Sequence, residues 1–282
     1  MSRYFTWIVL GLAAFYVIVS MVPPRDPENQ MHLQEFGAIP VVYQGRVKPF
    51  DTLVRNSLMM ISGRQTYVDL AGSRQPAIEW LLDVMTSRLH PGGAAEKKKV
   101  FRIENDQVLN LLGLEARPGL LYAVEEFVGK IEDLEKEATR ARKLESGRRD
   151  LFDKKVLEFA EKLMLHIQLA DLAIPHAVPP QSPQGDWMTI IDKAHEAQQK
   201  GEDSPAVRSL LTILQAYAEG KTEQFNSEVA RYRREFVRQM SEAHASGFEV
   251  FLTTSSRFTS AQYYTPSWAS WLAWRGWVGH NR

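Results

Sequence analysis

The sequence predicts a mainly α protein in which one N-terminal transmembrane helix precedes a helical extracytoplasmic domain with a small β element near its start. Three observations support this prediction. Residues 4–22 contain no charged side chain, and several later stretches repeat apolar residues at steps of three and four. A short β-branched run at residues 39–43 is followed by a Gln-Gly turn signal, which indicates a hairpin.

Composition excludes several classes of protein. The chain has 282 residues, of which 44% are apolar, so it is long enough to bury a sizeable core. Lysine plus arginine number 34, as do aspartate plus glutamate, and this balance gives no net field that would attract nucleic acid. The absence of cysteine excludes disulfides, thiolate metal sites, a cysteine nucleophile and covalent haem attachment in this chain.

Residues 1–22 are predicted to anchor the chain in the cytoplasmic membrane. At about 1.5 Å per residue, the uncharged stretch just crosses a hydrocarbon core of roughly 30 Å. A cleaved signal peptide is the alternative, but the following SMVPP lacks a small-x-small cleavage pattern. We therefore expect a single-pass anchor and an extended or irregular tether over residues 23–38. The cysteine-free bulk of the chain is expected to lie outside the cytoplasm.

Residues 39–173 are predicted to form a helical domain that begins with the hairpin. Asp51 or Thr52 then caps a helix that ends at Gly63. The side chains of this helix expected to face the core are Leu53, Val54, Leu58, Met59 and Ile61. A second helix has Pro76 in its first turn. Residues 90–99 are expected to form a solvated loop that carries no chemistry.

The second half of this domain is predicted to be a helical hairpin. Before it, residues 100–103 favour a short strand, and Asn105 or Asp106 caps a short helix. Apolar residues then recur at helical spacing over residues 119–144 and again over residues 151–172. Ser146 and Gly147 lie between these stretches, so the two helices are expected to pack antiparallel.

The C-terminal part of the chain is predicted to follow a linker. Residues 174–186 contain four prolines and are expected to form a linker or a loop over the surface. Residues 187–251 contain three more helical patterns, near residues 187–199, 205–218 and 222–245. Residues 252–282 form an atypical tail that is rich in tryptophan and tyrosine and lacks clear periodicity.

The sequence offers no enzyme signature. No two of the seven histidines have the spacing that places two metal ligands on one helix face. His166 interrupts an apolar stretch and is expected to be buried and hydrogen-bonded, whereas His176 lies among prolines and is expected to be exposed. We expect a protein that is not an enzyme, with no catalytic residue and no metal site.

The segment GRVKPFDT is the one candidate site. Gly45 can adopt positive φ, Pro49 restricts the backbone, and Asp51 can cap the next helix. Two interpretations of Arg46 remain open. Its guanidinium can clamp a carboxylate or a propionate in a bidentate fork, or Arg46 and Asp51 can simply lock the turn.

This segment and its surroundings resemble a known family. IPVVYQGRVKPFDTLVRNSLMMISGR is similar to the entry segment of the extracytoplasmic domain attached to CcsA/ResC-type cytochrome c biogenesis proteins, and further segments resemble its planctomycete-type versions up to residue 251. The residues that match the family motif are Gly45, Arg46, Lys48, Pro49, Asp51, Thr52 and Arg55. Val54 departs from the alanine expected in that pattern.

The resemblance implies a role in cytochrome c assembly. In that family a multi-helix membrane module binds haem and presents it to apocytochrome c, but its tryptophan-rich segment and histidine ligands match no residue here. The implied partners are ResB/CcsB-like and CcsA-like membrane proteins and apocytochrome c, with no cofactor held by this chain. Two interpretations of the atypical tail remain open. A frameshift after Phe251 would have removed the haem-binding module, or the tail is a genuine tryptophan- and tyrosine-rich segment that lies at the membrane interface.

Two functions therefore follow from the sequence. The first is a membrane-anchored accessory, or N-terminal, part of a system II cytochrome c biogenesis protein that assists haem delivery or apocytochrome c docking. The alternative is a membrane-anchored helical sensor or scaffold domain whose helical hairpin binds a protein partner.

Overall fold

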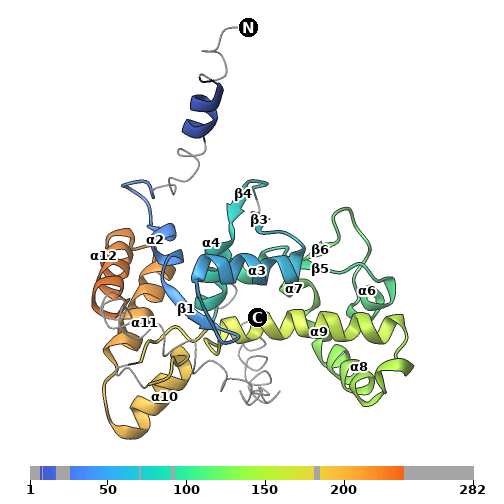
Figure 1. Cartoon of the computed structure of the whole chain (residues 1–282). Helices are drawn as coiled ribbons and strands as arrows, with labels where there is room; N and C mark the ends of the chain where they lie inside the picture. Colours follow the sequence, from blue (N-terminus) through green and yellow to red (C-terminus); the bar gives the residue numbers. More distant parts are fainter. Residues whose placement is uncertain are drawn as a thin grey trace.

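The computed structural model describes residues 7, 9–16, 26–69, 71–89, 93–180 and 185–237, and it confirms the mainly α prediction. Figure 1 shows helices throughout these residues, with strands only in short pairs. The helices are α2 (Leu33–Gly37), α3 (Phe50–Ser62), α4 (Ala77–Thr86), α5 (Ala94–Lys97), α6 (Asp106–Leu112), α7 (Val124–Phe127), α8 (Ile131–Lys143), α9 (Leu151–Ala170), α10 (Ile190–Lys200), α11 (Pro205–Ala218) and α12 (Thr222–Tyr232). The strands are β1 (Pro40–Tyr43), β2 (Arg46–Pro49), β3 (Thr66–Val68), β4 (Arg74–Pro76), β5 (Phe101–Arg102) and β6 (Leu121–Tyr122).

One contiguous apolar core joins the elements from α2 to α12. It extends from Phe36 in α2 to Tyr232 in α12 and includes the fully buried Trp80 of α4. Helix α4 packs against both α9 and α11, so it connects the α8–α9 hairpin to the pair formed by α11 and α12 (Figure 1). The aromatic ring of Phe101 meets that of Phe127 edge to face at 5.4 Å between centroids, a favoured geometry for buried rings.

The predicted β-hairpin is confirmed. Strands β1 and β2 pair antiparallel, with Tyr43 opposite Arg46. The two residues between them, Gln44 and Gly45, have φ values of 53° and 70°. Positive φ at both positions is the requirement of a type I′ turn, whose twist matches that of the flanking strands.

Helix α3 follows directly and ends as predicted at Gly63, whose φ is 73° and whose N–H donates to the carbonyl of Met59. The predicted core residues Leu53, Val54, Leu58 and Ile61 are buried, but Met59 is 43% exposed. The prediction for Met59 is therefore wrong. Its position lies one helical step of about 100° beyond the buried stripe, on the solvent side.

The predicted solvated loop at residues 90–99 is wrong where the structure describes it, which is from residue 93 onward. Residues 94–97 form the one-turn helix α5, in which Ala95 is buried, and Lys98 directly after it keeps only 7% of its surface exposed. The preceding helix α4 begins at Ala77, with Pro76 as the residue before it, in agreement with the prediction to within one residue.

The expected single helix over residues 119–144 is broken into several elements. Leu121 and Tyr122 form β6 and pair with β5, so this part of the stretch is extended. Helix α7 then follows, a 3₁₀ turn covers Val128–Lys130, and α8 begins only at Ile131. Pairing with a strand distant in sequence outweighed the helical periodicity here. The antiparallel packing of α8 against α9 and the turn at Ser146–Arg148 confirm the predicted hairpin.

The proline-rich segment does not lie over the surface. Ala177 and Val178 are buried, and the backbone of His176 pairs with Val42 of β1. Proline disfavours helix but accepts extended backbone, so this segment extends the edge of β1. His176 is half-buried rather than exposed. Residues 181–184 of the predicted linker lie outside the described residues.

The ends of the chain are described only in part. The three predicted C-terminal helices are confirmed as α10, α11 and α12, with a π-helical turn over Arg233–Val237, whereas residues 238–282, including the atypical tail, lie outside the described residues.

The second half of the predicted tether is not irregular, because α2 buries Phe36 in the core. Of the predicted anchor, residues 9–16 are helical, and most of the rest lies outside the described residues. No helix within the described part of the chain has the length and apolar character needed to span a membrane.

Candidate functional site

The motif residues lie in the turn and the second strand of the β1–β2 hairpin and in the first two turns of α3. Gly45 lies in the turn, and Arg46 follows it on the exposed strand β2. Among the described residues, no carboxylate forms an ion pair with Arg46. The ammonium of Lys48 lies 5.1 Å from the centroid of the Tyr43 ring, a cation–π distance. The hairpin therefore presents two cations, one over an aromatic face and one facing solvent.

The predicted cap of α3 is wrong. Helix α3 begins at Phe50, and the residue before it, Pro49, has the extended ψ of 150° and offers no side-chain cap. Asp51 and Thr52 consequently lie inside the first turn, where Asp51 Oδ2 accepts from Arg55 Nε at 2.7 Å. The carboxylate of Asp51 still stabilises α3, because a negative charge in the first turn interacts favourably with the helix dipole.

The contact between Arg46 and Asp51 that would lock the turn is not formed. Asp51 pairs with Arg55, which lies four residues later on the same helix, and not with Arg46. The turn itself is closed by the backbone, through the positive φ values of Gln44 and Gly45 and the register of the two strands. Arg46 is therefore available for an interaction beyond the hairpin.

A buried polar cluster that the sequence analysis missed surrounds Lys98. Its ammonium Nζ donates to the hydroxyl of Tyr67 at 2.6 Å, forms an ion pair with Asp83 and lies 3.7 Å from Glu79 Oε1. The Tyr67 hydroxyl in turn donates to Glu79 Oε1 at 2.6 Å. Tyr217 joins the cluster from α11, because its hydroxyl donates to Asp83 Oδ1 at 2.9 Å. These groups replace the water shell that Lys98 loses on burial.

Burial and charge keep both phenols of this cluster protonated. Desolvation raises the pKa of Tyr67 well above its ordinary value, and the hydrogen bond to Glu79 raises it further. Desolvation likewise raises the pKa of Tyr217, with the negative charge of Asp83 as the next cause. Both hydroxyls therefore remain donors at neutral pH. The cluster ties β3, α4, the segment after α5 and α11 together by hydrogen bonds.

One sequence signal could have revealed this cluster. Glu79 and Asp83 are spaced four residues apart on α4, whose other residues are almost all buried. Two carboxylates on one face of such a helix need a cation nearby. The identity of that cation could not be read from the sequence, because Lys98 lies between two further lysines and its partner Tyr67 is 31 residues away.

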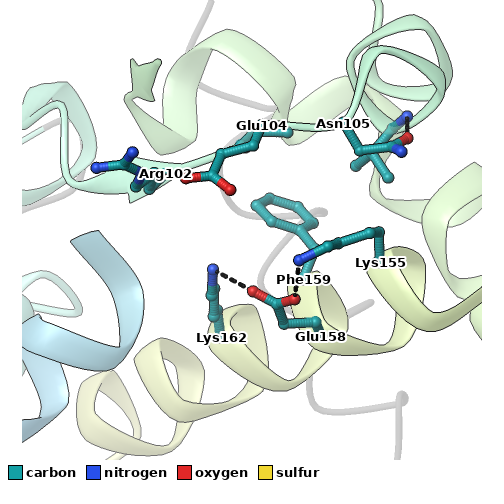
Figure 2. Close-up of a pocket in the computed structure, with 9 residues that line it drawn as sticks. Arg102, Glu104, Asn105, Lys155, Glu158, Phe159 and Lys162 are labelled. Carbon is teal, nitrogen blue, oxygen red and sulfur yellow. Dashed lines mark hydrogen bonds and ion pairs between the residues drawn. The ribbon is translucent and has the colours of Figure 1, made fainter. Parts of the chain in front are cut away.

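A small charged pocket lies between the segment after β5 and helix α9. Figure 2 shows Glu158 between two lysines of its own helix, with Glu104 and Arg102 on the opposite side. Glu158 accepts from Lys155 at 2.7 Å and from Lys162 at 2.9 Å, and these hydrogen bonds lower the pKa of its carboxyl. Arg102 likewise pairs with Glu104 at 2.6 Å, so each cation that lines the pocket already has a carboxylate partner, with Glu158 shared by the two lysines.

His166 is buried as expected, but it lacks the expected hydrogen bond at one nitrogen. Its Nδ1 has no hydrogen-bond partner among the described residues, and its ring packs between Trp80 and Phe101. Desolvation, with a smaller effect of the positive charge of Arg88, lowers the pKa of His166 from 6.5 to about 4. The imidazole is therefore neutral at physiological pH.

Haem does not fit beside His166. The cavity next to this histidine has a volume of about 30 Å³, whereas pockets for drug-sized ligands enclose about 300–1,000 Å³. The described residues also contain no group of three or more side chains suited to hold a metal ion.

Comparison with known proteins assigns no family, since neither a family model nor a curated protein matches the chain.

Proposed function

We propose that the chain is a membrane-anchored accessory part of a system II cytochrome c biogenesis protein, equivalent to its N-terminal extracytoplasmic region. It assists haem delivery or apocytochrome c docking and catalyses no reaction itself. The proposal places the chain in the cytoplasmic membrane with residues 1–22 as a single-pass anchor. Its partners are ResB/CcsB-like and CcsA-like membrane proteins and apocytochrome c, and any haem is held by the partners.

The observation that carries the proposal is the exposure of the family motif. The motif extends from the turn of the β1–β2 hairpin into α3, and on strand β2 it presents the side chain of Arg46 to solvent. A guanidinium offers a planar fork that matches a carboxylate or a haem propionate in two parallel hydrogen bonds. A surface fork of this kind supports docking to a partner that carries such a group.

The position of the hairpin supports the same proposal. It begins less than twenty residues after the uncharged stretch that we propose as the anchor. An extended chain of that length reaches at most about 60 Å. The hairpin would therefore lie within reach of membrane partners bound at the same outer surface.

The test is co-purification of the tagged full chain from membranes. We expect ResB/CcsB-like and CcsA-like proteins or apocytochrome c in the eluate, and we expect Arg46→Lys to lose most of this capture. Arg74→Lys is the matched control, because Arg74 is also exposed and lies outside the segment that resembles the family. Recovery of the chain in the soluble fraction would contradict the proposal. A stable complex with an unrelated signalling protein would contradict it in favour of the sensor or scaffold alternative.

A further inference from the structure

The outer edge of β2 has one residue with both backbone groups available. Val42 of β1 uses its N–H and its carbonyl in hydrogen bonds to the backbone of His176, at 2.9 and 3.0 Å. Val42 is directly opposite Val47. In an antiparallel pair, residues whose backbone groups point away from each other form the non-hydrogen-bonded positions. The N–H and carbonyl of Val47 therefore point outward, on the side of β2 away from β1.

The hydrogen bonds at the other end of the β1–β2 ladder also place Val47 at a non-hydrogen-bonded position. The N–H of Phe50 donates to the carbonyl of Ile39 at 3.0 Å, so this pair is hydrogen-bonded and the pairs alternate from there to Val47. Pro49 is at the next outward position and has no N–H. Within the described residues nothing bonds to the backbone of Val47, and 46% of the surface of its side chain is exposed.

The charges beside Val47 select the kind of segment that can pair there. Arg46 and Lys48 flank it and point to one face of the strand, since side chains alternate along β2. Neither forms an ion pair with a described residue. A second copy of β2 at this edge would bring like charges together, which is unfavourable for directly opposed cross-strand pairs.

From these observations we infer that the outer edge of β2 binds an extended acidic segment of a partner protein by strand addition at Val47. An apolar residue of the segment exchanges two backbone hydrogen bonds with Val47. Its two neighbours are acidic and lie opposite Arg46 and Lys48, which gives the pattern acidic–apolar–acidic. This inference goes beyond the proposed function, because it needs no haem and no cytochrome.

The experiment measures binding of fluorescent peptides to the full chain in detergent. The test peptide carries Glu-Val-Glu in an extended, threonine-rich context, and its control carries Lys-Val-Lys. We expect the first to bind with an affinity that falls as salt rises, and the second not to bind. The double substitution Arg46→Glu with Lys48→Glu should weaken binding about ten-fold or more. Arg64→Glu, which changes an exposed arginine outside β2, should leave binding unchanged.

A second variant and a second readout separate backbone pairing from charge. Val47→Pro removes the outward N–H without breaking a bond to β1, so it should weaken binding while the circular dichroism spectrum stays the same. The Val47 amide should exchange rapidly with solvent in the free protein and slowly in the complex. Equal binding of the two peptides, or an amide already protected in the free chain, would overturn the inference. So would concentration-dependent dimerisation lost in Val47→Pro.

Discussion

Acidification should destabilise the fold through His166. Its folded-state pKa of about 4 lies below the value of 6.5 that describes the unfolded chain. As the pH falls below 6.5, the unfolded chain binds a proton that the folded protein does not bind, so the free energy of unfolding decreases. The loss continues down to about pH 4 and is constant below it.

The two pKa values set the size of the effect. A difference of about 2.5 corresponds to roughly 3 kcal/mol, because each pKa unit is worth about 1.4 kcal/mol. At pH 5 the loss attributable to His166 is about 2 kcal/mol. This is a large share of the roughly 5–15 kcal/mol by which domains are stable.

Urea unfolding of the full chain at pH 7.5 and pH 5, followed by circular dichroism, measures this loss. His166→Met keeps a similar volume but cannot be protonated, so it should lose about 2 kcal/mol less than the wild type between these pH values. The exposed His195 provides the control substitution His195→Met, which should behave like the wild type. Equal losses in His166→Met and the wild type would refute the assignment of a neutral, desolvated imidazole.

Three further predictions concern stability. Lys98→Met leaves the carboxylates of the buried cluster without their cation, so the free energy of unfolding in urea should fall by roughly 3–5 kcal/mol. Lys99→Met, at an exposed position, should lower it by less than about 0.5 kcal/mol. Similar costs for the two would show that the cluster is not intact. At the start of α6, the side chain of Asn105 accepts a hydrogen bond from the N–H of Val108 at 3.0 Å. Asn105→Ala removes this cap and should lower the free energy of unfolding by about 1 kcal/mol. Asn110→Ala, on the exposed face of α6, should leave it unchanged. A neutral Asn105→Ala would contradict the cap. Gly45→Ala places a side chain at a φ of 70° and should lower the melting temperature by a few degrees, and an unchanged value would argue against the type I′ turn.

Local signals predicted much of the fold. The Gln-Gly pair predicted the turn of the β1–β2 hairpin, because few residues other than glycine and asparagine adopt positive φ readily. Gly63 predicted the end of α3, and the pair Asn105 and Asp106 predicted the start of α6, where Asn105 forms the cap, because caps are made within a few residues. The periodicity of α9 predicted its whole length to within two residues.

The candidate site was predicted less completely. The motif residues were identified, and Gly45 has the positive φ expected of it. The roles of Asp51 and Thr52 were misassigned, because local sequence fixes the first residue of a helix only to within one or two positions. Helix α3 begins at Phe50, so both residues lie inside it and neither caps it. The Lys98 cluster was missed, since its acidic, basic and phenolic members come from four separate parts of the chain.

Local residue patterns are enough to predict the helical character, the hairpin, the turns and most helix ends, because each depends on residues that are close together along the chain. Long-range packing, in contrast, makes residues 121–122 a strand, buries residues 177–179 of the proline-rich segment and places Lys98 in the interior. Each of these outcomes depends on a partner far along the chain: β5 for the strand, β1 for the segment, and Asp83 for the lysine. The free energy of burial and of paired charge is set by such partners, and no local pattern records where they lie.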